Sequence, residues 1–226
     1  YPNGQLGDDS AMVQLVKAGV LDVAKVSAGA LEQFNPAYSI FSVPYVFQST
    51  EHYFNTMNNS EAVQEIFNST RDDGFIAIGW FDSGARSIYT TKEGPVESPK
   101  DLNGLKIRTM NSPTSVEMIN NMGGSATPMS SGEVYTSLQQ GILDGAENNE
   151  TVLVDDGHGE VCKSYTYTQH QYLPDIVIMS IETYDSMTEE DRQVVYDAMK
   201  EAWQAHEDEW LQVVERNKEG AKEMGV

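Results

Sequence analysis

Hydrophobic and polar positions along the chain change repeatedly between helix-like and strand-like spacing. Turn residues at 1–4 precede a helical pattern that starts near residue 9 and that Gly19 ends. Strands are expected at 21–26, 74–80, 86–91, 105–110, 142–147 and 165–180. Helices are expected at 51–71 as two short pieces, and at 113–122 and 133–140, with a single helical turn at 98–102. This succession of helices and strands predicts an α/β fold.

Two apolar segments need separate interpretation. Residues 41–47 are apolar, but Pro44 interrupts them, so an extended passage or a sheet edge is expected there. Residues 74–80 are rich in β-forming side chains without such an interruption, which predicts a central strand. Pro174 allows a kink in the long strand-like stretch at 165–180.

A long helix is expected near the end of the chain. Thr188 and Asp191 resemble a capping box, and apolar residues recur every three or four positions from Val195 to Val213. A helix of about 36 residues would be roughly 54 Å long. That length suits an element lying across two lobes, and a coiled-coil arm is the alternative.

Charge and cysteine content exclude several classes of protein. The 226 residues carry 35 acidic and 14 basic side chains, a net charge of −21, which argues against a nucleic-acid partner. No apolar run reaches the roughly 18–20 residues that span a bilayer. Cys162 is the single cysteine, so no intrachain disulfide can form. The polar stretch at 155–162 lacks zinc-ligand spacing, and a polar loop is preferred there to a metal site.

Sequence motifs of enzymes are absent. The chain has no GxSxG, Walker A or HExxH motif, and its four histidines are scattered. No catalytic residue and no cofactor are therefore expected. An enzyme acting on a carboxylic acid, with Glu147 or His170 as general base, remains an alternative.

Two arginines stand out in a chain with few basic residues. Arg86 follows the small residues 83–85, and Arg108 shares one face of its predicted strand with Lys106. Each could simply pair with one of the many acids. Polar residues at predicted strand ends favour a ligand site instead: Asn111, Glu147, Asn148 and Asn149. A planar guanidinium beside side-chain amides matches a carboxylate with hydroxyls.

Several longer segments occur together in one order: YPNGQLGDD, SVPYVF, SPKDLNGLKIRTMNS, GGSATPMSSGEVYTSLQQGILDGAENN and the helix after MTEEDRQ. With them the chain resembles the extracytoplasmic solute-binding subunit of TRAP transporters, the DctP type, over nearly its whole length. Relative to that family, the first strand and helix and the C-terminal tail are expected to be missing from this sequence.

The resemblance implies two α/β lobes hinged around a deep cleft, as in periplasmic binding proteins. Lobe I would comprise residues 1–83 and about 174–212, and lobe II residues 84–173 and about 213–226. The implied role is capture of an organic acid, outside the cytoplasm, by a monomer that delivers it to TRAP permease subunits in the membrane. A sensory domain of the same fold is the alternative role.

The resemblance also assigns residues to the ligand. Arg108 matches the family's carboxylate-binding arginine, Arg86 its second basic position, Asn148 the asparagine after the DGxE turn, and Asn111 a nearby polar contact.

The ligand itself is predicted from departures within the family. Sialic-acid binders carry Glu at the position of Ser27 and an aromatic residue at that of Ser131, which argues against sialic acid. Similarity to members associated with sugar acids favours a hexuronate such as glucuronate or galacturonate. A C4-dicarboxylate, a keto acid or an aromatic acid remains open. Further candidate contacts to hydroxyls or a second anion are Lys25, Ser27, Asn149, Tyr167 and His170.

Overall fold

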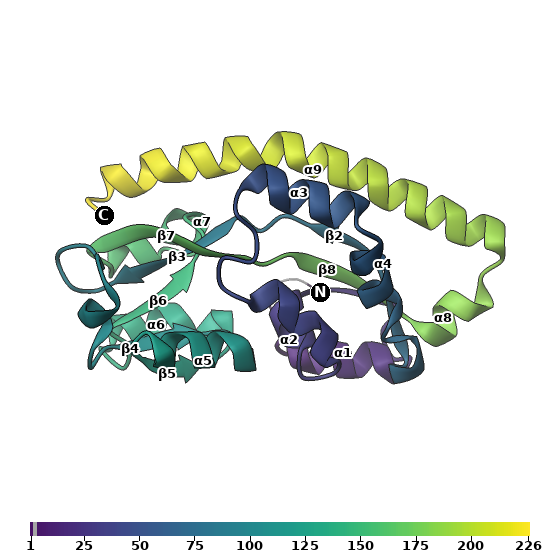
Figure 1. Ribbon diagram of the computed structural model, residues 1–226, viewed down its shortest axis with the longest axis horizontal. Helices are drawn as coiled ribbons and strands as arrows, with labels where there is room; N and C mark the ends of the chain where they lie inside the picture. Colours follow the sequence, from purple (N-terminus) through teal and green to yellow (C-terminus); the bar gives the residue numbers. More distant parts are fainter. Residues whose placement is uncertain (2–3) are drawn as a thin grey trace.

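The computed structural model describes residues 1 and 4–226, apart from the side chain of Asp208, and has two α/β halves side by side (Figure 1). Pro2 and Asn3, part of the turn predicted at 1–4, lie outside the described residues. Each half contains its own sheet, and one long helix runs along both (Figure 1). The predicted α/β class is confirmed.

The first sheet has three antiparallel strands in the order β1-β8-β2. They are β1 (Val23–Ser27), β8 (Asp175–Ser180) and β2 (Phe75–Phe81). Helices share one apolar core with this sheet: α1 (Asp9–Lys17), α2 (Ala28–Leu31), α3 (Thr50–Asn59) and α4 (Glu61–Asn68). The prediction of a central strand at 74–80 is wrong. Among the described strands β2 lies at the edge, because the chain returns late to insert β8 between β1 and β2.

The second sheet has five strands in the order β5-β4-β6-β3-β7. They are β5 (Ser125–Pro128), β4 (Lys106–Thr109), β6 (Gly145–Asn148), β3 (Ala85–Thr90) and β7 (Ser164–Tyr172). The helices that pack on it are α5 (Pro113–Asn121), α6 (Val134–Gln139) and α7 (Thr151–Val154). β4 is parallel to β6, whereas β3 is antiparallel to β6. The carboxyl ends of β4 and β6 therefore lie beside the start of β3.

The chain crosses twice between the two sheets along neighbouring segments. Residues 82–84 join β2 to β3, and Leu173 with Pro174 joins β7 to β8. The Ser83 hydroxyl donates a hydrogen bond to the Leu173 carbonyl at 2.8 Å, which ties the crossings together. The kink predicted at Pro174 is confirmed, and it divides the strand-like stretch at 165–180 into strands of different sheets.

The long helix α9 (Glu189–Glu223) begins with the predicted capping box and lies over both halves (Figure 1). Its first part packs on β2 and its last part on α7. The coiled-coil alternative is therefore wrong, since the apolar side of the helix is used within the chain. In the part of the chain that the structure describes, no helix is long and apolar enough to cross a membrane.

Short helical segments complete the chain: η1 (Pro36–Ser42), η2 (Arg71–Asp73), η3 (Pro99–Leu102), η4 (Ser131–Glu133), η5 (His158–Glu160) and α8 (Ile181–Ser186). The extended passage predicted at 41–47 is wrong at its start, because its first two residues end η1. The two helices predicted at 51–71 are confirmed as α3 and α4, which meet at Ser60.

Candidate functional site

Arg108 lies on β4, and its side chain is buried. Its residue is 5% exposed, whereas Lys106, two positions earlier, is exposed. Its Nε and Nη2 donate to the Met129 carbonyl at 3.0 and 2.8 Å. Within the described part of the chain, no carboxylate forms an ion pair with it. Burial lowers the pKa of Arg108 from its ordinary value, partly opposed by the negative charge of Glu147.

Arg86, on β3, has a different environment. Its Nε and Nη2 donate to the Glu147 carboxylate at 2.5 and 3.1 Å, and Nη2 also donates to the Glu147 carbonyl at 2.7 Å. Both residues are buried. Burial alone lowers the pKa of Arg86, but the charge of Glu147 outweighs this effect and raises it. The guanidinium of Arg86 is therefore neutralised inside the protein.

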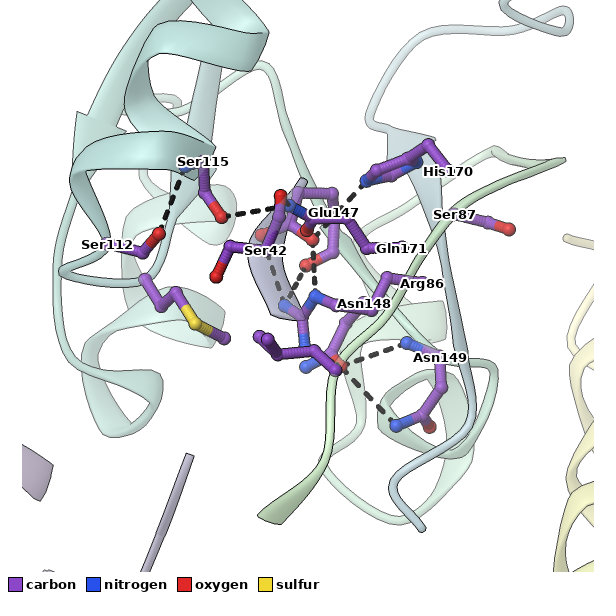
Figure 2. Close-up of polar contacts among 12 residues, drawn as sticks. Ser42, Arg86, Ser87, Ser112, Ser115, Glu147, Asn148, Asn149, His170 and Gln171 are labelled. Carbon is purple, nitrogen blue, oxygen red and sulfur yellow. Dashed lines mark hydrogen bonds and ion pairs between the residues drawn. The ribbon is translucent and has the colours of Figure 1, made fainter. Parts of the chain in front are cut away.

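Asn148 connects this ion pair to the surroundings of the site (Figure 2). Its Oδ1 accepts hydrogen bonds from Arg86 Nη1 at 2.8 Å and from the Asn149 backbone N–H at 2.9 Å. Because both neighbours are donors, the amide oxygen must face them. Among the residues that the structure describes, none accepts a hydrogen bond from Asn148 Nδ2, so this group is a donor for another partner.

His170, on β7, closes the buried cluster on the far side of Glu147 (Figure 2). Its Nε2 lies 3.7 Å from Glu147 Oε2, and its Nδ1 lies 2.8 Å from the Thr168 hydroxyl. The residue is fully buried. The register of β7, β3, β6 and β4 thus brings His170, Arg86, Asn148 and Arg108 into one region.

Ser27 and Lys25 lie on β1, in the first sheet. The Ser27 hydroxyl contacts the Met110 sulfur at 3.5 Å, across the boundary between the halves. Lys25 Nζ forms an ion pair with the Asp175 carboxylate and is more than half exposed. Lys25 is therefore already neutralised.

Asp9 belongs to this group but was absent from the predicted site. Its Oδ2 accepts a hydrogen bond from the Ser27 backbone N–H at 3.0 Å. Burial raises the pKa of Asp9, and its negative charge in turn acts on the pKa of Arg108. In the sequence Asp9 indicates only the start of a helix, and the fold is needed to place it near Arg108.

Three other predicted site residues lie elsewhere or already have partners. The Asn149 amide donates to the Ser83 carbonyl at 2.6 Å and accepts from the Thr151 hydroxyl at 2.6 Å. Tyr167 is 54% exposed. Asn111 lies where the halves meet, with its Nδ2 3.5 Å from Asp8 Oδ2.

Two cavities and the potential metal ligands of the described residues can be compared with the position of Arg108. Two cavities, of about 210 and 160 Å³, lie near Trp80 and Trp203 and near Phe47 and Val63, away from Arg108. The described residues contain no cluster of three or more His, Cys, Asp or Glu side chains able to hold a metal ion. In the 155–162 loop, His158 instead forms a 2.8 Å hydrogen bond with the Tyr89 hydroxyl.

Comparison with known proteins identifies the family. The sequence model of a protein family, DctP, the bacterial extracellular solute-binding protein family 7, matches residues 1–226. The chain belongs to this family. As a DctP-family chain it has the two-lobed fold of the TRAP solute-binding proteins, to which the two sheets described above correspond.

Relatives and solved structures of this DctP-family chain are similar over its whole length. YiiZ of Salmonella typhimurium is 44% identical over 96% of the chain, which spans 66% of YiiZ, about two thirds of its length. The solved structure of a TRAP periplasmic solute-binding protein from Anaerococcus prevotii, with bound D-glucuronate, is 49% identical in sequence and superposes with a TM-score of 0.96. The match covers 100% of this chain and 73% of the Anaerococcus chain. A TRAP periplasmic solute-binding protein from Xanthobacter autotrophicus, with bound β-D-galacturonate, is 32% identical and superposes with a TM-score of 0.95. That match covers 100% of this chain and 75% of the Xanthobacter chain.

Proposed function

We infer that this DctP-family protein binds a hexuronate, D-glucuronate or D-galacturonate, between its two lobes and delivers it to a TRAP-type permease in the membrane. The observation that carries the inference is the buried guanidinium of Arg108, which has a carbonyl partner but no carboxylate partner among the described residues. A buried cation without an acid is costly, and a ligand carboxylate satisfies it.

The charge of the site favours a ligand with one carboxylate. Glu147 neutralises Arg86 and Asp175 neutralises Lys25, so Arg108 is the one cation of this group that forms no ion pair among the described residues. A C4-dicarboxylate would need a second cation. A hexuronate has one carboxylate and several hydroxyl groups, which suit side-chain amides, hydroxyls and carboxylates as partners.

Each residue then has a distinct role. Arg108 binds the ligand carboxylate, and Asn148 donates from Nδ2 to a ligand oxygen. Arg86 acts as a positioning residue, since it fixes the orientation of the Asn148 amide. Asp9 and Ser27, on the opposite lobe, contact hydroxyl groups of the ligand. The solved relatives with bound D-glucuronate and β-D-galacturonate support this choice of ligand.

The proposal extends to the lobe boundaries, the location and the oligomeric state. Lobe I comprises residues 1–83 and about 174–212, lobe II residues 84–173 and about 213–226, and the hinge includes the segments at 82–84 and 173–174. The protein acts outside the cytoplasm, as a monomer, and releases its ligand unchanged. The family description as extracellular solute-binding proteins supports both the location and the absence of turnover.

A thermal-shift panel on ligand-stripped protein tests the proposal. The panel contains D-glucuronate, D-galacturonate, D-gluconate, succinate, a keto acid and D-glucose. A ligand at 100 times its dissociation constant stabilises the native state by about 2.7 kcal/mol, which a melting curve resolves. Stabilisation by the two uronates is expected. Stabilisation by succinate alone would replace the proposed ligand, and no stabilisation by any acid would remove the basis of the proposal.

A further inference from the structure

Two short segments from opposite halves of the protein, at the end of α2 and the start of α5, are joined by hydrogen bonds. The Glu32 carboxylate follows α2 in the first half. Its Oε1 accepts a hydrogen bond from the Ser112 hydroxyl at 2.7 Å, and its Oε2 accepts one from the Thr114 backbone N–H at 3.2 Å. The neighbouring Gln33 Nε2 donates to the Asn111 carbonyl at 2.6 Å.

Glu32, like Asp82, is a buried acid that forms no ion pair with a cation among the described residues. Its residue is 9% exposed, and within the described part of the chain no Lys, Arg or His forms an ion pair with it. Its compensation comes from the first turn of α5, where free backbone N–H groups and the helix dipole favour a negative charge. The compensating groups all belong to the other half of the molecule.

The contact continues inward as a chain of polar groups (Figure 2). The Ser112 hydroxyl accepts from the Ser115 backbone N–H at 3.0 Å. Gln171 Nε2, on β7, donates to the Ser115 hydroxyl at 3.3 Å and to the Ser42 carbonyl in the first half at 2.5 Å. The contact at Glu32 is thus connected to Gln171, the residue that follows His170.

The two halves also approach closely beside this contact. A Cβ atom added to Gly29, in α2, would lie 2.5 Å from the Met110 sulfur and 3.3 Å from Ser112 Cβ. A side chain at position 29 would therefore have to displace the Met110 side chain, so glycine suits this close approach of α2 to the segment between β4 and α5. That segment directly follows Arg108, so its position is tied to the proposed carboxylate-binding group.

We propose that Glu32 is a latch: it caps α5 of the opposite lobe only when the lobes are closed and thereby retains the ligand. The proposal rests on the function proposed above. Glu32 is a positioning residue, since it acts through the α5 segment rather than on the ligand. Opening the lobes separates Glu32 from Ser112 and Thr114, so the contact contributes to the closed state and not to the open one.

The latch predicts a specific kinetic effect. Glu32→Gln removes the charge and leaves one side-chain oxygen, instead of two, to accept from the Ser112 hydroxyl and the Thr114 backbone N–H. Since the lost contact exists only after closure, ligand dissociation accelerates about tenfold, which corresponds to about 1.4 kcal/mol, and the association rate stays unchanged. The melting temperature of ligand-free protein also stays unchanged. A purely structural role would lower that temperature and leave the dissociation rate alone.

The experiment measures association and dissociation of D-glucuronate by stopped-flow tryptophan fluorescence in wild type, Glu32→Gln, Ser112→Ala and the double variant. Glu61→Gln is the matched control, because Glu61 is an exposed acid in the first turn of its own helix, in the same half. The latch predicts faster dissociation in both single variants, with no further acceleration in the double variant. Equal dissociation rates in wild type and Glu32→Gln would overturn the latch while leaving the proposed function intact.

A second measurement separates the two proposals if D-glucuronate does not bind to wild type. Spin labels on the exposed positions Asn59→Cys and Lys100→Cys report the distance between the halves, and the native Cys162 is buried. The latch predicts a smaller closed fraction in Glu32→Gln than in wild type. Equal closed fractions, with and without the panel acids, overturn it.

Discussion

The buried ion pair between Arg86 and Glu147 allows a quantitative prediction for Glu147→Gln. The Glu147 carboxylate is fully buried and accepts two hydrogen bonds from Arg86 at 2.5 and 3.1 Å. Glutamine keeps the shape of the side chain but removes the charge. The guanidinium of Arg86 is then a buried cation without a carboxylate partner, and its acceptors are neutral: the residue-147 carbonyl, Asn148 Oδ1 and the single amide oxygen of the glutamine.

The size of the effect follows from the pKa of Glu147. Burial alone raises this pKa, but the charge and hydrogen bonds of Arg86, with those of His170, outweigh burial and lower it from 4.5 to about 2. A shift of this size corresponds to about 3 kcal/mol of stabilisation of the folded state. In other proteins, breaking a buried ion pair by removing one partner costs about 3–5 kcal/mol, and the value from the pKa shift agrees with that range. We therefore expect Glu147→Gln to lower the free energy of unfolding by about 3 kcal/mol at pH 7.

Urea denaturation of ligand-free protein at several pH values tests this reasoning. Because the folded-state pKa is lowered, the stabilisation is complete above about pH 4.5 and is lost as the pH falls toward 2. The difference between wild type and variant should shrink over that range. Glu219→Gln, which breaks an exposed pair with Lys222, is the control and should match wild type. A difference below about 1 kcal/mol at pH 7, or one independent of pH, would refute the reasoning.

Three further predictions concern other parts of the molecule. Asn148→Ala should weaken uronate binding about tenfold in calorimetry, since one hydrogen bond to the ligand is lost. Burial raises the pKa of Asp82 to about 6. The unfolded chain therefore loses the Asp82 proton more readily than the folded protein, and the free energy of unfolding falls as the pH rises from about 4 to 6. Asp82→Asn should therefore gain up to about 3 kcal/mol over wild type in urea denaturation between pH 4 and 7. Gly145→Ala should lower the melting temperature strongly, because its Cβ would lie 2.4 Å from the Tyr89 carbonyl oxygen.

The sequence predicts best those elements whose signals are local. The capping box at Thr188, the glycine ends of helices and the Pro174 kink all lie where the structure has them. The short strand β5 was not predicted, because its residues are polar or small and it exists only through its pairing with β4. The edge position of β2 also depends on a distant strand, β8, which the local pattern does not reveal.

Some residues of the site can likewise be predicted from the sequence, whereas others depend on contacts that only the fold creates. Arg108 could be found because a basic residue on a short apolar strand is rare, and the family resemblance gave it a role. The pairing of Arg86 with Glu147 joins residues 61 positions apart and depends on sheet register. Glu32 carries no local signal at all, since its partners belong to the other half. The orientation of a side chain such as Asn149 likewise follows from its neighbours in the fold and not from its position after a strand.

Calorimetric titration of D-glucuronate into wild type and Arg108→Ala tests the central claim most directly, with D-glucuronamide as the uncharged ligand. Arg71→Ala, which removes an exposed arginine paired with Asp185, is the control variant. We expect Arg108→Ala to weaken D-glucuronate binding by about 2–5 kcal/mol, roughly 30- to 5000-fold, and to erase the preference over the amide. Arg71→Ala should bind like wild type. Unchanged D-glucuronate affinity in a folded Arg108→Ala protein would contradict the claim that Arg108 holds the ligand carboxylate.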